Sequence, residues 1–163
     1  MGKYENGYYG FSIVIPSGRK AFWNSMRCVK DEKYGCVCMT DHGRSIMLSD
    51  ESGIEAFAGF EMDPELSLAG REKDNVTFLK ERKGVEQVSV LSSRQIRLRR
   101  VEARRFVVRF VAQGKTMIED RIIALREGVE YYLTLNTPES RYQEDKREFE
   151  KVVASWRFIP RAR

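Results

Sequence analysis

The stretches EDRIIALREGVEYYLTL (residues 119–135) and SRYQEDKREFEKVVASWRFI (residues 140–159) decide the fold class. The first predicts two strands, Asp120–Leu125 and Val129–Leu135, joined by a tight turn. The second predicts a helix and then a closing strand, Ser155–Ile159. This alternation predicts an α+β fold, in which an antiparallel sheet of about six or more strands carries packed helices.

The predicted helix has one apolar side and one charged side. Ser140 and Gln143 fit a capping box at its start, and Thr137-Pro138 offers a competing start one turn earlier. Because the apolar residues follow helical spacing, core packing against a sheet is favoured over a cofactor or partner site. These residues are Tyr142, Phe149, Val152, Val153 and Trp156.

The loops on either side of the strand Asp120–Leu125 set its register. We expect Gln113-Gly114-Lys115 to form a three-residue loop, which pairs Phe106 with Ile122, and Glu127-Gly128 to form a two-residue loop. Asp120 then shares an apolar face with Ile122, so it needs a basic or hydrogen-bonding partner there.

Turn residues divide the rest of the chain into further elements. Asp63-Pro64-Glu65 predicts a helix start, and the helix spans Leu66–Lys83 and stops at Gly84. Residues 21–33 look irregular, and prolines fall only at element edges, so we expect a single domain, residues 1–163. Additional strands are expected at Phe11–Pro16, Cys36–Thr40, Ser45–Ser49, Ile54–Met62, Val85–Val90, Gln95–Val101 and Arg105–Ala112.

Composition limits the function classes. With 42% hydrophobic and 33% charged residues, the 163-residue chain has the make-up of a soluble globular protein. No apolar run approaches the roughly 20 residues of a membrane span, so we expect none, and no signal peptide is visible after Met1. The net charge of +5 permits an acidic partner, whereas the absence of a nucleic-acid-binding motif argues against nucleic acid.

The opening Asn6–Pro16 and the closing segments Tyr131–Leu135 and Ser155–Phe158 resemble the PsbP-like superfamily, which includes photosystem II PsbP, a Ran-binding nuclear transport factor and bacterial DcrB-type proteins. The opening Asn6–Pro16, NGYYGFSIVIP, is similar to the family's "n-x-x-gfsi-x-iP" start. Tyr131–Leu135, the apolar residues of the last helix, and Ser155–Phe158 look like the family's final strand, helix and "S-F-R" ending. The middle agrees only in element order, and the Cys28–Cys38 segment lies outside the pattern.

The resemblance implies a binding or scaffolding protein, monomeric or homodimeric, with no catalytic residues and no cofactor. Among the bacterial members it favours a periplasmic or secreted protein over a cytoplasmic one. No functional residue carries over, because members of the superfamily do not share a site.

Three cysteines and one histidine, Cys28, Cys36, Cys38 and His42, could complete a tetrahedral metal site. Their spacing matches no zinc motif, so buried free thiols are favoured. A disulfide from Cys28 to Cys36 or Cys38 is the alternative in an exported protein. A hydrolase built on a Cys-His pair is remote, because no third group orients the imidazole.

Seven arginines lie between Arg94 and Arg109, against a single acid, Glu102. We expect Arg97, Arg99, Arg105 and Arg109 to form a basic stripe on an exposed sheet face. A merely solvated face, with Arg109 paired to Glu119, is one interpretation. The other is a surface that docks an acidic protein, since arginine binds carboxylates in bidentate fashion.

Aromatic residues near the start could alternatively line a groove, although packing at the core is favoured for Tyr8, Tyr9 and Trp23. The sequence therefore predicts a non-enzymatic interaction module that docks an acidic partner through a basic sheet face. A carrier of a small ligand or metal is the runner-up.

Overall fold

The computed structural model describes the chain apart from residues 1, 24–27, 32, 34, 39 and 163, and describes β4 and β5 by their backbone alone. The helices are α1 (Leu68–Glu81), the 3-10 helix η1 (Glu139–Arg141) and α2 (Tyr142–Ser155). The strands are β1 (Gly2–Asn6), β2 (Phe11–Ile15), β3 (Ala21–Trp23), β4 (Cys28–Asp31), β5 (Gly35–Cys38), β6 (Gly43–Met47), β7 (Gly53–Phe60), β8 (Val85–Leu98), β9 (Val101–Ala112), β10 (Lys115–Arg126), β11 (Val129–Pro138) and β12 (Arg157–Phe158).

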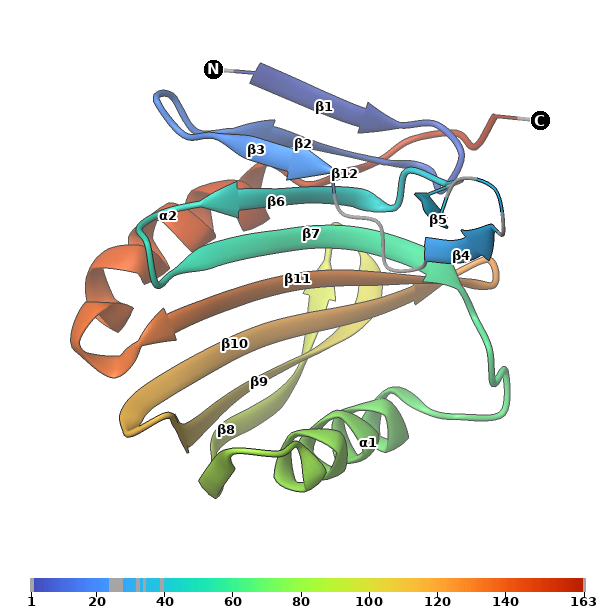
Figure 1. Cartoon of the computed structure of the whole chain (residues 1–163). Coiled ribbons are helices and arrows are strands. Elements are labelled where there is room, and N and C mark those ends of the chain that lie inside the picture. The colour runs from blue at the N-terminus through green and yellow to red at the C-terminus, as the bar shows by residue number, and fades with distance from the viewer. Residues whose placement is uncertain (1, 24–27, 32, 34, 39, 163) are drawn as a thin grey trace.

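Seven strands form one antiparallel sheet in the order β3-β6-β7-β11-β10-β9-β8 (Figure 1). A second antiparallel sheet has the order β1-β2-β12, and β4 and β5 pair with each other as a separate hairpin. An α+β fold with an antiparallel sheet is therefore confirmed. The edges of the large sheet are β3 and β8, and β8 carries most of the arginine-rich stretch.

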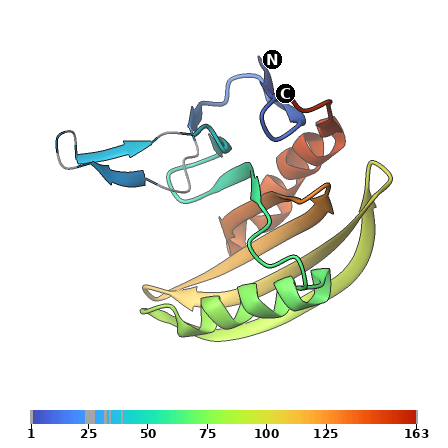
Figure 2. The same cartoon turned by 90° about the vertical axis from the view of Figure 1, so that its right-hand side faces the viewer.

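The two helices pack on opposite faces of the large sheet (Figure 2). The α2 face shares its core with the small sheet, whereas α1 covers residues of β8, β9 and β10. Neither these helices nor any other in the described part of the chain has the length and apolarity needed to cross a membrane.

Aromatic rings hold the small sheet, α2 and the large sheet together. Phe11 of β2 stacks on Trp156 with ring centroids 4.7 Å apart, and Tyr131 of β11 meets Trp156 edge-on at 5.8 Å. All three side chains are fully buried, as are Phe149 and Val152 of α2. The predicted apolar side of the last helix is thus part of the core.

Of the two loops predicted on either side of β10, one is confirmed and the other is wrong. Ala124 pairs with Tyr131 across a two-residue turn at Glu127-Gly128, as predicted. At the other end the three-residue loop is wrong, because Lys115 already pairs with Ala112. The turn contains only Gln113 and Gly114, whose φ angles of 51° and 73° suit a primed two-residue turn.

A loop shorter by one residue shifts the pairing of β9 with β10 by one position. The side chains of β9 therefore lie on the opposite faces of the sheet from those predicted. Phe106 pairs with Arg121 instead of Ile122 and packs under α1. Arg105 pairs with Ile122 and therefore lies on the α2 face. The predicted outward direction of Arg105 is wrong for this reason.

The two strands predicted within residues 85–101 are a single strand, β8, with register shifts near Gln87 and Leu91. These shifts interrupt the alternation of side chains, so the segment does not look like one long strand in sequence. Val101 belongs to β9, because Arg99 and Arg100 form a turn with φ angles of 49° and 72°.

Both helices begin later than predicted. Ser67 caps α1 by accepting a hydrogen bond from the amide of Gly70, so the helix starts at Leu68. The expected capping box of α2 does not form, because η1 precedes the helix and Arg141 occupies the capping position without a side-chain bond.

Gly43 starts β6 where the backbone of β7 approaches most closely. A Cβ atom at this position would overlap the carbonyl oxygen of Ala56 and lie 2.7 Å from the Cα of Phe57. Both obstacles are backbone atoms in the middle of the paired strand β7, so they cannot move aside as a side chain could.

Candidate functional site

Arg105 is an interior residue. Its Nε and Nη2 each donate to Asp120 at 2.9 Å, and Nη2 also donates to Glu150 of α2 at 2.5 Å. Tyr142 donates a further hydrogen bond to Asp120 at 3.0 Å. Burial by itself would lower the pKa of Arg105, but the hydrogen bonds and charges of Asp120 and Glu150 outweigh it and raise that pKa.

This network supplies the basic partner that the sequence predicts for Asp120, whose side chain is completely buried. Because Arg105 is only 7% exposed and its guanidinium is occupied by two carboxylates, it offers nothing to a partner protein. Its role in the structure is to join β9, β10 and α2.

Arg109 is exposed but already paired. Its Nε donates to Glu139 of η1 at 3.1 Å, and both side chains are about half exposed. The pairing with Glu119 that the sequence suggests is wrong, since Glu119 forms an ion pair with Arg121 at 2.8 Å. An exposed ion pair of this kind stabilises a protein little and opens easily.

Arg97 and Arg99 lie together at the end of the β8–β9 hairpin, and both are exposed. Within the described residues, Arg97 donates to the carbonyl of Arg100, at 3.4 Å, and to no other group. Arg99 reaches the C-terminus of α2, where it donates to the carbonyls of Trp156, at 2.9 Å, and Ala154. Arg157 donates to the same two carbonyls, so two guanidinium groups cover the negative end of α2.

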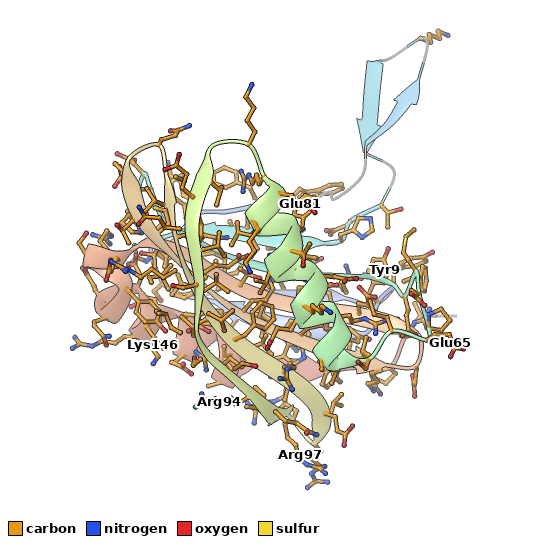
Figure 3. The ribbon with its side chains drawn as sticks, turned by 90° about the horizontal axis from the view of Figure 1, so that it is seen from below. Tyr9, Glu65, Glu81, Arg94, Arg97 and Lys146 are labelled. Carbon is orange, nitrogen blue, oxygen red and sulfur yellow. The ribbon has the colours of Figure 1, made fainter. Side chains whose placement is uncertain are left out.

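We call the arginines at this end of the molecule the basic tip: Arg94, Arg97, Arg99, Arg100 and Arg157. Figure 3 shows Arg94 and Arg97 at one end of β8, with Glu81 of α1 towards the other. Glu102 faces Arg97 across the β8–β9 ladder and is the acid of this region. Among the described residues, no ion pair holds Arg94, Arg97 or Arg100.

The structure thus brings together only two of the four arginines of the predicted stripe. Arg97 and Arg99 belong to the basic tip. Arg105 lies opposite Arg94 in the β8–β9 ladder but is buried, and Arg109 lies further along β9; carboxylates hold both of them. Arg94 and Arg100 are in the arginine-rich stretch but outside the predicted stripe, and Arg157 lies far away in sequence. The Arg99-Arg100 pair between two strand-like segments was the available signal for a basic turn.

The cysteine segment forms the β4–β5 hairpin, in which Cys28 and Cys38 occupy paired backbone positions. The side chains of Cys28, Cys36 and Cys38 lie outside the described residues, so the metal-site and disulfide hypotheses stay predictions. His42 is described: its Nδ1 is 2.8 Å from the carbonyl of Ala58, and its ring stacks on Tyr9. Nothing within the described part of the chain groups three metal-ligating side chains.

No protein-family model and no curated protein sequence matches the chain. Several solved structures do match in three dimensions. Cyanobacterial PsbP (CyanoP) from Synechocystis sp. PCC 6803 matches with a TM-score of 0.66 and 10% identity, over 97% of this chain and 92% of that one. LpqN, involved in cell envelope biogenesis of Mycobacterium tuberculosis, matches with a TM-score of 0.58 and 15% identity, over 98% and 90%.

Protein PA94 of unknown function from Pseudomonas aeruginosa is similar with a TM-score of 0.54 and 10% identity, over 93% of this chain and 92% of that one. At such identities the likeness concerns the fold alone. The chain therefore has the PsbP-like fold that the two ends of its sequence predict.

Proposed function

We propose that this chain is a non-catalytic interaction module that docks an acidic protein partner through the basic tip. The observation that carries the proposal is that unpaired arginines cluster at the tip, whereas the arginines of α1, of β9 and of the middle of β10 are paired. Arg71, Arg104, Arg105 and Arg121 each have a carboxylate partner within the chain. Arg94, Arg97 and Arg100 are exposed and, among the described residues, have none.

The charge of the tip suits carboxylates on a folded surface or an acidic peptide. The tip carries five arginines, Glu102 lies opposite one of them, and the whole chain carries a net charge of +5. Guanidinium groups bind carboxylates through two parallel hydrogen bonds, which gives direction as well as attraction. The turn of the β8–β9 hairpin is held in place, because Arg99 donates a hydrogen bond to the carbonyl of Trp156 at the end of α2.

The first test uses a fluorescein-labelled octaglutamate peptide as a defined carboxylate probe and measures anisotropy. We expect binding at about 50 mM NaCl that weakens strongly at about 300 mM, because salt screens exposed charges. The triple variant Arg94→Glu/Arg97→Glu/Arg100→Glu should weaken binding at least ~10-fold.

The matched control is Lys80→Glu/Arg82→Glu/Lys83→Glu, which changes the net charge equally at the exposed end of α1. We expect it to retain affinity within about 2-fold. Equal losses in the two variants would show a response to net charge alone and would contradict the proposal. The same variants, used to capture proteins from a native extract, then identify the partner as the protein lost only with the tip variant.

A further inference from the structure

A cavity of about 610 Å³ lies between the turn that joins β10 to β11 and the chain that follows β12. Both segments lie at the end of the molecule where the chain terminates (Figure 1). The lining includes two arginines, Arg126 and Arg161, and one acid, Glu127. The volume is within the range of sites for small ligands, which extends from about 300 to 1,000 Å³. We call it the C-terminal cavity.

Arg161 is held in the wall of this cavity by the turn between β1 and β2. The amide of Ile159 donates to the carbonyl of Gly10 at 3.0 Å, which fixes the chain just before the arginine. The arginine stem then lies against Gly10, where a Cβ atom would be 2.7 Å from the Cγ of Arg161. Its Nε donates to the carbonyl of Tyr8 at 3.2 Å, and its guanidinium group lies 5.3 Å from the centre of the Phe60 ring. A donor held in this way loses little freedom when a ligand binds.

Arg126 is the last residue of β10 and is half-buried. Its guanidinium group lies 5.2 Å from the centre of the Phe158 ring. Its Nη1 is buried and has no hydrogen-bond partner among the described residues. Because this cation is partly removed from water, an anion beside it interacts more strongly than it would with a fully solvated arginine.

The charges of the cavity are unequal. In the described part of the chain, neither Arg126 nor Arg161 forms an ion pair. Arg161 uses only its Nε in a described hydrogen bond, which leaves two further nitrogens without an acceptor there. Glu127 is exposed and pairs with neither arginine. The lining therefore carries two positive charges against one negative charge.

All three charged groups act on one buried hydroxyl group. Burial raises the pKa of Tyr131, whereas the charges of Arg126 and Arg161 lower it and the charge of Glu127 raises it. Such effects decrease with distance, so both guanidinium groups lie near Tyr131. Two cations near one point repel each other, and an anion bound between them relieves that repulsion.

We infer that the C-terminal cavity binds a small polar molecule through a carboxylate or phosphate group. Guanidinium groups bind either group through paired, charge-assisted hydrogen bonds. The cavity supplies two such cations beside a space of suitable size. No arginine of the basic tip lines it, so the site is separate from the docking surface and does not depend on the proposed function.

The test titrates inorganic phosphate and, separately, succinate into isotopically labelled protein and follows the arginine Nε–H signals by nuclear magnetic resonance. Ionic strength is held constant, at about 50 mM, so that screening does not change. We expect the signals of Arg126 and Arg161 to shift together and to saturate with at least one anion, with a Kd between about 0.1 and 5 mM. The anion that binds more tightly identifies the group. No saturation with either anion up to about 20 mM would overturn the inference.

Matched variants locate the site. Arg126→Gln/Arg161→Gln removes two positive charges from the cavity and should weaken anion binding at least ~10-fold. The control Arg94→Gln/Arg97→Gln removes the same charge from the basic tip and should keep the affinity within about 2-fold. Equal losses in the two double variants would show a response to net charge alone and contradict the inference.

Glu127→Gln gives a result of the opposite sign. It removes the negative charge of the cavity and should strengthen anion binding by about 2- to 5-fold. A gain in affinity cannot come from a loss of folding, so this variant keeps the test decisive if Arg126→Gln/Arg161→Gln proves unstable in thermal unfolding. Weaker or unchanged binding in Glu127→Gln would place the anion elsewhere.

Discussion

A single buried guanidinium group connects three elements of this protein. Arg105 joins β9 to Asp120 of β10 and to Glu150 of α2, and Tyr142 completes the hydrogen bonding of Asp120. Removing one member of such a network leaves the other charge buried without a partner, whereas replacing both can be nearly neutral.

We expect Arg105→Met to lower the free energy of unfolding by about 3 to 5 kcal/mol, because the buried carboxylate of Asp120 then has no positive charge beside it and keeps only the hydrogen bond from Tyr142. The double variant Arg105→Met/Asp120→Leu should recover most of this loss. Urea denaturation monitored by circular dichroism measures both. A double variant as unstable as the single one would mean that Arg105 acts through packing and not through its charge.

At the scale of elements, the turn between β8 and β9 combines strain with charge. Arg99 and Arg100 both adopt positive φ angles, which residues other than glycine adopt at a cost of about 1 to 2 kcal/mol each. The two-residue turns that join β9 to β10 and β10 to β11 place glycine at the second position, Gly114 and Gly128. An arginine at position 100 is therefore unfavourable for the turn itself, which is consistent with a role for it in binding.

We expect Arg100→Gly to raise the free energy of unfolding by about 1 kcal/mol and, at the same time, to weaken binding of the octaglutamate peptide. Thermal unfolding and anisotropy measure the two effects on one variant. Gln113→Asn is the matched control, because it improves a turn of the same kind without removing an arginine. Arg100→Gly with unchanged peptide binding would remove Arg100 from the docking surface.

At the scale of the whole molecule, the ring cluster of Phe11, Tyr131 and Trp156 makes one core out of two sheets and α2. Phe11 comes from the small sheet, Tyr131 from the large sheet and Trp156 from the end of α2. The second apolar cluster, under α1, packs on the other face of the same large sheet. Small domains built in this way usually unfold in a single cooperative step.

We expect Phe11→Ala to lower the free energy of unfolding by about 3 to 5 kcal/mol, because it leaves a cavity among rings that cannot collapse into it. For each of the two proteins, wild type and variant, the midpoint from tryptophan fluorescence, which includes Trp156, should equal the midpoint from far-ultraviolet circular dichroism. Two separate transitions would contradict the prediction that residues 1–163 form a single domain.

Local sequence patterns were sufficient for the fold but not for the surface. The alternation in Phe11–Ile15 and the helical spacing around Phe149 depend on neighbouring residues, so they could be predicted. Whether Arg105 points inward depends on whether the loop after Ala112 has two or three residues, which the sequence leaves open. The cluster of Tyr9, His42 and Phe60 could not be predicted, because these residues meet only in three dimensions.

The close approach of β6 and β7 at Gly43 has a consequence for the evolutionary history of this fold. Since even a methyl group would overlap the backbone of Ala56, every descendant that keeps this strand pair must keep glycine at this position. Structures at 10 to 15% identity share too few residues for a reliable alignment. A glycine that backbone geometry requires in this chain marks one position, Gly43, at which an alignment of such distant sequences can be checked.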